Sequence, residues 1–180
     1  MRKTNITKWT AQWNEDYYKE KLLLETIFEE ELIDLFHIGS TSIQAIGYAK
    51  PIIDILMVVR NIDKIDLYNE EMSVLGYNAK GENDISGRRY FTKGGDNRTH
   101  HLHVFQVEHE HIDIHLNFKA YLKQHPDEAR KYGEHKLQLA ERFFEDHHKY
   151  QQAKQQYTDE LVRKAMDWVR HMKAIQIEIR

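Results

Sequence analysis

The stretch His37-Ile38-Gly39-Ser40-Thr41-Ser42, followed by Lys50-Pro51-Ile52-Ile53-Asp54, decides the fold of this 180-residue chain. In the first part, a short apolar piece ends at a glycine that hydroxyl residues follow. This order predicts a strand-to-helix turn, in which Ser or Thr can cap the next helix. In the second part, residues 52–59 are rich in Ile and Val and predict a buried strand. Asp54 therefore lies inside an apolar strand.

The turn and the acid both indicate chemistry. A Gly-Ser turn that opens a helix presents backbone N–H groups and hydroxyls, which suit a phosphate, so Gly39, Ser40 and Thr41 are candidate phosphate-binding residues. A carboxylate in an apolar strand is costly to bury unless it is paired or binds a metal, which makes Asp54 a candidate site residue. The alternative is a hydrogen-bonded core aspartate beside an ordinary capped turn.

Outward from this stretch, helices and strands are predicted in segregated blocks. We expect helices at 13–32 and 63–75, the second ended by Gly76, and a strand at 35–38. Gly94-Gly95-Asp96-Asn97 predicts a hairpin between strands 89–93 and 100–107. From about residue 109 the pattern is helical, with one helix opened by Pro126 and a long last helix. We predict an α+β fold, with a small mixed sheet, packed helices and a helical C-terminal third, in a single domain spanning 1–180.

Composition excludes several classes of protein. The chain has no cysteine, so disulfides and thiolate nucleophiles are excluded. The formal net charge of -3 does not favour an extended nucleic-acid-binding surface. The start of the chain does not resemble a signal peptide, and the longest apolar run is far shorter than the roughly 20 residues that cross a bilayer. We expect a cytoplasmic protein without a membrane partner.

The chain has twelve histidines, and several lie close together in the sequence. His101 and His103 are two apart on a predicted strand and so share one face. If that face also carries Asp54 and His37, the group could bind a transition metal or transfer protons. The alternative is a strand with one polar face. The four-residue spacing of His111 and His115 on a predicted helix is compatible with zinc.

The second histidine pair and the basic residues are less specific. No glutamate follows His111, as a zinc protease would need, so we favour a solvated helix face there. Lys50 and Arg89, with Arg88 and Arg98, flank the predicted strands and could neutralise phosphates. They could equally be surface charges.

A Gly-Ser turn followed by an acid in the next strand resembles the signature of the nucleotidyltransferase superfamily. The ordered strings HIGSTS, KPIIDI, LGY, GRRYFTKG, RTHHLHVF and YLKQHP resemble the GrpB family, also called UPF0157, from about Trp13 to about Ala165. The resemblance implies a nucleotidyltransferase-like fold. The family is sometimes fused to dephospho-CoA kinase, which implies a link to nucleotide or coenzyme A metabolism.

The chain departs from the superfamily pattern in the acids that hold the metal ions. Active nucleotidyltransferases usually carry Asp-x-Asp on this strand and a third acid on a later strand, whereas this chain has Leu56 in the second position. In the later strand no acid occurs before Glu108. One carboxylate is a weak magnesium site, so two-metal chemistry is in doubt.

The residues and the resemblance together predict an enzyme that acts on a small phosphate-containing ligand, such as a nucleoside triphosphate or a coenzyme A-like molecule. It would transfer a nucleotidyl or phosphoryl group. Asp54, His101 and His103 would be catalytic and would hold a divalent Mg, Mn or Zn. Phosphate would be bound by Gly39, Ser40, Thr41, Lys50 and Arg89. The alternatives are a non-catalytic nucleotide- or coenzyme A-binding module and a histidine-dependent metal phosphoesterase.

Overall fold

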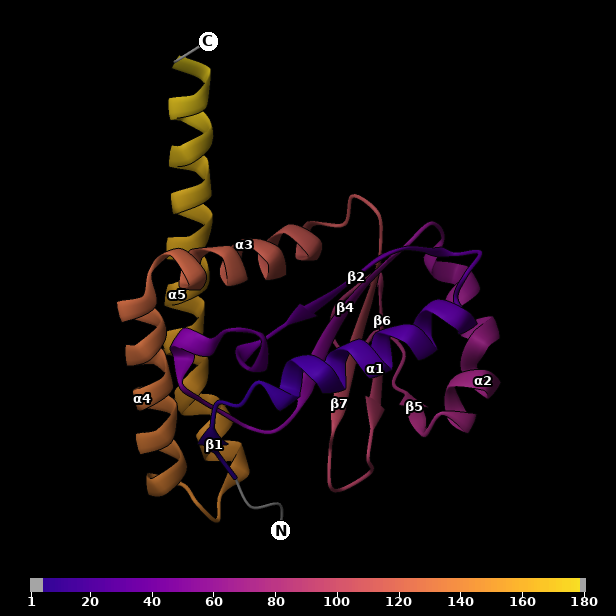
Figure 1. Ribbon diagram of the computed structural model, residues 1–180, viewed down its shortest axis with the longest axis horizontal. Helices are drawn as coiled ribbons and strands as arrows, with labels where there is room; N and C mark the ends of the chain where they lie inside the picture. The colour runs from indigo at the N-terminus through magenta and orange to yellow at the C-terminus, as the bar shows by residue number, and fades with distance from the viewer. Residues whose placement is uncertain (1–4, 179–180) are drawn as a thin grey trace. The chain divides into compact units, whose positions relative to one another are not determined.

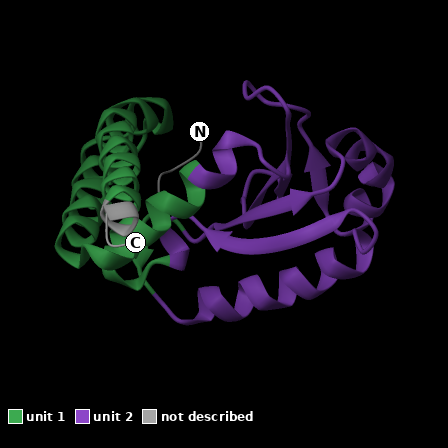
Figure 2. Cartoon of the chain, turned by 90° about the horizontal axis from the view of Figure 1, so that it is seen from above, with its two compact units in different colours: residues 1–9, 43–50, 114–180 green, residues 10–42, 51–113 purple. Residues whose placement is uncertain are grey.

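A computed structural model describes residues 5–178 of the protein. The chain forms two compact units, each built from separate stretches of sequence (Figure 2). Unit 2 comprises Thr10–Ser42 and Pro51–Asp113, and unit 1 comprises the described residues up to Trp9, with Ile43–Lys50 and Ile114 onward. The single-domain organisation stays a prediction.

Unit 2 is built around a five-stranded sheet in the order β2-β4-β7-β6-β5. Its strands are β2 (Leu32–Ile38), β4 (Ile53–Val59), β5 (Tyr77–Ala79), β6 (Arg88–Lys93) and β7 (His100–Gln106). Strands β4 and β7 pair in parallel and all the other neighbours pair antiparallel. The mixed sheet, the buried strand at β4 and the β6-β7 hairpin are as the sequence predicts.

The first helix of unit 2, α1 (Gln12–Ile27), lies across one face of this sheet (Figure 1). Its apolar residues at helical spacing, such as Tyr17 and Leu24, are buried. The helix ends where the N–H of Phe28 donates to the carbonyl of Leu24. The predicted extension to Leu32 is wrong, because Leu32 begins strand β2 and is hydrogen-bonded there as part of the sheet.

The strand alternation divides the residues of the sheet between two faces. On the α1 face, Ile55 of β4 is next to Leu102 of β7, which in turn is next to Phe91 of β6. All three side chains are at most 1% exposed. On the opposite face, called here the Asp54 face, Asp54 is next to His101. The α1 face therefore carries this buried apolar cluster, and Asp54 and His101 lie together on the opposite face.

The connection from β4 to β5 also covers the sheet. It consists of a 3₁₀ helix η3 (Ile62–Tyr68) and the short helix α2 (Asn69–Val74), whose Ile65 and Met72 are fully buried. Gly76 follows with a φ of +85°, a left-handed conformation that stops a helix. The helix predicted at 63–75 is thus a 3₁₀ helix followed by an α-helix.

Unit 1 is mainly helical. Its elements are β1 (Thr7–Lys8), η2 (Gln44–Ile46), β3 (Tyr48–Ala49), most of α3 (Glu110–Gln124), α4 (Pro126–Arg142) and α5 (His147–Glu178). Strand β1 pairs with β3, a contact of two residues that the sequence did not reveal. Helix α4 begins at Pro126 as predicted and packs on η2 so closely that a Cβ at Gly133 would lie 1.7 Å from the carbonyl oxygen of Ile46. The mixed sheet and the helical C-terminal third together confirm the predicted α+β class.

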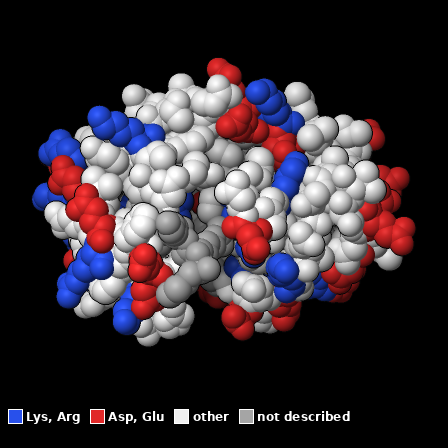
Figure 3. Space-filling model, turned by 90° about the horizontal axis from the view of Figure 1, so that it is seen from below, with Lys and Arg blue, Asp and Glu red and all other residues white. Residues whose placement is uncertain are grey.

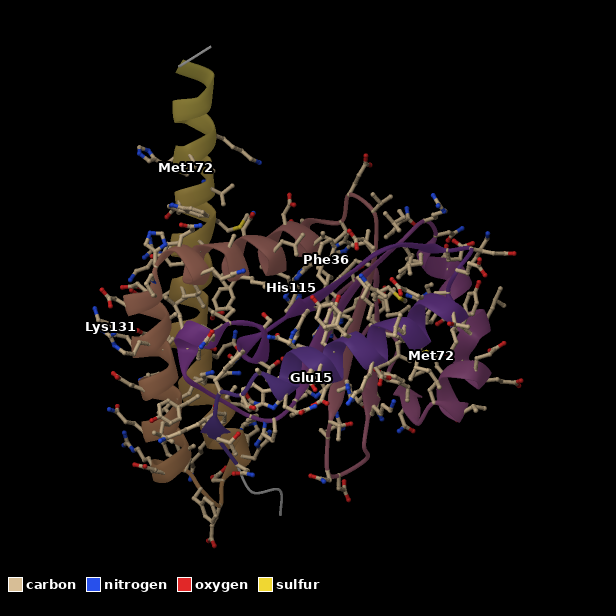
Figure 4. All side chains as sticks on the ribbon, viewed as in Figure 1. Glu15, Phe36, Met72, His115, Lys131 and Met172 are labelled. Atoms are coloured by element: carbon tan, nitrogen blue, oxygen red, sulfur yellow. The ribbon has the colours of Figure 1, made fainter. Side chains whose placement is uncertain are left out.

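Residues 170–174 of α5 are exposed. Met172, labelled in Figure 4, lies on this part of the helix with 43% of its surface exposed. Among the described residues, no helix has the length and apolar character that a membrane crossing requires. On the face shown in Figure 3, Lys and Arg side chains are interspersed with Asp and Glu.

Candidate functional site

The centre of the candidate site is the carboxylate of Asp54 on the Gly39 turn, and both belong to unit 2. Gly39 follows strand β2 with a φ of +67°, a left-handed conformation that favours glycine. A Cβ added at Gly39 would lie 2.4 Å from the Oδ2 atom of Asp54. Only glycine can therefore satisfy both the backbone and the neighbouring carboxylate. The sequence prediction that the Gly-Ser turn and the acid meet is supported by this contact.

His101 holds the other oxygen of the same carboxylate. Its Nδ1 atom lies 2.9 Å from Oδ1 of Asp54, because the two residues are register partners on parallel strands. An ionised carboxylate only accepts hydrogen bonds, so Nδ1 carries the proton and Nε2 of the neutral ring has a lone pair. The Asp54 and His101 side chains are 28% and 22% exposed. The pair therefore presents a base, oriented by an acid, that solvent can reach.

His103 lies two residues further along β7 on the same face, beside Arg88. Tyr90 stands between the two histidines, with its ring centroid 5.7 Å from that of His101 and 5.0 Å from that of His103. The Nη1 atom of Arg88 is 3.5 Å from Nδ1 of His103. A guanidinium can only donate, so Nδ1 of His103 accepts and its Nε2 carries the proton. The two histidines thus present opposite tautomers.

The turn after Gly39 differs from the predicted helix start. It is a 3₁₀ helix of three residues, η1 (Ser40–Ser42), followed in the chain by the equally short η2. Thr41 is buried, its hydroxyl donates to the carbonyl of Ile52, and it lies 3.0 Å from Nε2 of His37. Ser42 donates to the carbonyl of Gly39. These two hydroxyls hold the turn in shape, and so short a helix adds no substantial dipole for a phosphate.

Arg89 does not lie with Asp54. The hairpin register places it opposite Val104, on the α1 face, where its Nε donates to both carboxylate oxygens of Asp66 at 2.9 and 3.0 Å. Lys50 belongs to unit 1. There its ammonium lies 4.2 Å from the centroid of the Tyr150 ring and 3.4 Å from Nδ1 of His147.

The structure separates His37 from Asp54 and partly buries His111. His37 pairs with Ile55 and so lies on the α1 face, buried and stacked on Tyr17, whereas Asp54 lies on the opposite face. His111 is only partly exposed: its ring stacks on Phe105 with a centroid distance of 5.5 Å, and burial lowers the pKa of its imidazole. The positions of both histidine side chains depend on tertiary contacts that local spacing does not specify.

The donors of the site do not form a preformed metal cage. Among residues 5–178 no three His, Asp or Glu groups gather in a way that could hold a metal ion. The second-acid position, Leu56, is fully buried. His101 uses Nδ1 for Asp54, and His103 has the Arg88 cation beside it. The set fits a cation that takes most of its oxygens from a bound ligand and one from Asp54.

Tyr90 was not considered from the sequence, and Arg88 was considered as a phosphate-neutralising residue but was not included in the predicted site. They lie on the Asp54 face because they are two apart on β6 and face Phe105 and His103. The alternation of side chains along a strand could have indicated these two residues, because either the even-numbered or the odd-numbered residues of 88–93 had to lie on the Asp54 face.

A family model described as GrpB protein matches residues 3–164. The chain belongs to the GrpB family. It is 41% identical to the UPF0157 protein YqkA of Bacillus subtilis over 93% of this chain, and it spans only 48% of that relative's length. It is 36% identical to the glutamate-rich protein GrpB of Alkalihalophilus pseudofirmus, covering 85% of this chain and 90% of the relative.

Solved structures agree with the GrpB assignment. The crystal structure of the conserved protein GrpB from Enterococcus faecalis matches with a TM-score of 0.82 and 37% identity, over 89% of this chain and 98% of that one. The Cid1 poly(U) polymerase matches with a TM-score of 0.50 and 14% identity, over 76% of this chain and 43% of that one. The second likeness shows that the GrpB chain shares the nucleotidyltransferase-like fold.

Proposed function

We propose that this GrpB-family protein is an enzyme that binds a phosphate-bearing ligand, such as a nucleoside triphosphate or a coenzyme A-like molecule, and transfers its nucleotidyl or phosphoryl group. The observation that carries the proposal is the Asp54 carboxylate, seated on the Gly39 turn and hydrogen-bonded to Nδ1 of His101. The pair lies on a sheet of the nucleotidyltransferase type, which supports phosphate chemistry.

His101 would act as the general base. Its Nε2 lone pair takes the proton from a hydroxyl or amine of the acceptor, whose oxygen or nitrogen then forms a bond to phosphorus. The bond between phosphorus and the bridging oxygen of the leaving phosphate breaks, and the electron pair of that bond stays on the leaving oxygen. Asp54 orients the ring and stabilises the imidazolium that forms. Gly39 leaves room for the carboxylate to reach this position.

A divalent cation, when bound, would neutralise charge on the phosphates. Asp54 offers it an oxygen, and the ligand's phosphates would supply the others, which suits magnesium or manganese. Zinc would need more nitrogen ligands than the Asp54 face brings together.

The test is a screen for ligands followed by an assay for turnover. Nucleoside triphosphates, pyrophosphate and coenzyme A, each with and without Mg, Mn and Zn, should include a compound that raises the melting temperature. With that compound, His101→Ala should lower turnover at least about 100-fold, the usual contribution of a general base, and leave binding within a few-fold. Asp34→Asn, at an exposed carboxylate of β2, is the matched control. No shift with any compound, or unchanged turnover in His101→Ala, would contradict the proposal.

The second candidate is a binding module without catalysis. It is favoured by Leu56, which fills the second-acid position with a fully buried apolar side chain. Binding of a nucleotide or coenzyme A with no turnover against water, hydroxyl or amine acceptors would establish this alternative. Turnover with water alone would indicate a phosphoesterase.

A further inference from the structure

Arg88 is a buried cation that forms no ion pair with a carboxylate of the residues that the structure describes. Only 5% of the residue is exposed. Desolvation lowers the pKa of its guanidinium, and the Asp84 carboxylate opposes this shift without forming an ion pair. A buried charge is expensive unless it is paired, so the arginine needs an account.

Part of that account is structural. The Nε atom donates to the carbonyl of Glu82 at 3.0 Å, and Nη2 donates to the carbonyl of Asn83. Arg88 thereby holds the loop of residues 81–87, in which Asn83 and Asp84 both have positive φ. Carbonyl dipoles satisfy hydrogen bonds, yet they carry no net charge to balance the guanidinium.

Arg88 lies on the Asp54 face and has hydrogen-bonding capacity that its contacts do not use. A guanidinium has five N–H groups. Three have partners: one on Nε, one on Nη2, and one on Nη1 toward His103. One N–H on each of the two terminal nitrogens is left over among the described contacts. The ring of Tyr90, 4.8 Å from the guanidinium carbon, fixes the plane of the group.

His103 adds a donor to the same place. Because its Nδ1 accepts from Arg88, its Nε2 carries a proton and can only donate. A fork of guanidinium N–H groups beside an imidazole N–H is the arrangement that recognises the oxygens of a phosphate or carboxylate. Both groups are hydrogen-bond donors here, so neither can bind a cation.

We propose that Arg88 and His103 form an oxyanion-binding subsite for the ligand of this enzyme. His103 is two residues from His101 on β7, so the bound oxyanion lies about 7 Å along the strand from the base. The ligand therefore carries a phosphate or carboxylate group at that distance from its reacting atom. This inference takes its ligand from the proposed function, but simple anion binding tests it without turnover.

The matched pair Arg88 and Arg89 makes the test sharp, because the two side chains are adjacent in sequence and lie on opposite faces of the sheet. Binding of pyrophosphate and of malonate to the full chain is measured by calorimetry at low salt. Arg88→Met should weaken binding of at least one anion about tenfold or more, the loss expected for hydrogen bonds to a charged group. Arg89→Met should leave it within twofold. The anion that responds identifies phosphate or carboxylate as the natural group.

His103 provides a second, independent variant. Gln places an amide N–H near the position of Nε2, so His103→Gln should keep most of the affinity, whereas His103→Asn, whose amide lies nearer Nδ1, should lose it. Thermal melts show whether each variant is folded at the measuring temperature. Folded Arg88→Met with unchanged affinity would reduce Arg88 to a loop anchor and overturn the proposal. Failure of the wild type to bind either anion would also overturn it.

The test of the oxyanion-binding subsite can be distinguished from the test of the proposed function. Asp54→Asn removes a negative charge and should not weaken the simple anions. If His101→Ala leaves turnover unchanged while Arg88→Met abolishes anion binding, the subsite stands and the general-base role falls.

Discussion

Both faces of the sheet in unit 2 carry ionised side chains, but the charges on the two faces are compensated differently. On the α1 face, the ammonium of Lys93 lies 2.8 and 3.0 Å from the two carboxylate oxygens of the buried Glu20. On the Asp54 face, Arg88 forms no ion pair with any carboxylate in residues 5–178, and Asp54 is hydrogen-bonded to His101. The first face has its charges matched within the protein. The second leaves a cation and a base, which is why we assign binding and chemistry to it.

The largest expected effect comes from breaking the ion pair of Glu20 and Lys93. Glu20→Ala should lower the free energy of unfolding by about 3 kcal/mol, the lower end for a buried pair, since Lys93 is partly exposed and can still reach water. Urea denaturation measures it. The exposed pair of Asp127 and Arg130 is the control, and Asp127→Ala should change little.

The same pair also has a stricter test. Replacing both partners, Glu20→Leu with Lys93→Met, should recover most of the lost stability, because no charge is then left buried alone. A double variant as unstable as Glu20→Ala would show that the cost comes from packing and would weaken the contrast between the two faces.

The second prediction concerns the Gly39 turn. Gly39 and Gly47 both have left-handed φ values, +67° and +74°, but a Cβ at Gly47 would meet nothing within 4 Å. Gly47→Ala should cost about 1–2 kcal/mol for the backbone alone. Gly39→Ala should cost about 1–2 kcal/mol more, because its Cβ overlaps Oδ2 of Asp54 and displaces the carboxylate.

Denaturation of the two alanine variants measures the difference. Gly39→Ala should also lose turnover in the assay that the ligand screen provides, whereas Gly47→Ala should keep it. Equal stability of the two variants would mean that Asp54 moves aside without cost and is not held by the turn.

Much of unit 2 could be predicted from sequence because its signals are local. The Ile- and Val-rich run of β4 and the Gly-Gly-Asp-Asn turn before β7 specify elements through chain stiffness and turn chemistry. The two-residue pair of β1 with β3 and the three-residue strand β5 are too short to carry a periodic pattern. Leu32 continued the helical spacing of α1, and only the competition of strand pairing ended that helix.

The sequence could predict shared faces within one strand but not the register between strands. His101 and His103 share a face of β7, as their two-residue spacing predicts, whereas the position of Asp54 beside His101 depends on the pairing of β4 with β7. That the three residues form a catalytic or metal site stays a prediction. The sequence offered Arg88 and Arg89 together as residues that could neutralise phosphates, and only Arg89 was included in the predicted site. The two lie on opposite faces, because a shift of one residue along a strand moves a side chain to the other face. That register is fixed by the hairpin as a whole.

The smallest expected effect is a pH dependence on the α1 face, centred on His100. Its Nε2 atom lies 3.8 Å from Oε2 of Glu20, and its ring is near Tyr77. Burial lowers the pKa of His100 below its ordinary 6.5, the Lys93 ammonium lowers it further, and the Glu20 carboxylate opposes both. Below pH 6.5 the unfolded chain therefore binds a proton that the folded protein resists. Stability is fully present above that pH and is lost as the pH falls through the pKa of the folded state.

His100→Asn removes this titration, so the variant should lose less of its free energy of unfolding than the wild type between pH 7.5 and 5.5. Urea denaturation at the two pH values measures it, and His171→Asn, at an exposed position of α5, should behave as the wild type does. The effect is small because Glu20 favours the imidazolium that burial disfavours. A wild type that gains stability on acidification would show that Glu20 dominates over desolvation. In that case Lys93 would compensate Glu20 only in part, and the contrast with the Asp54 face would have to be given up.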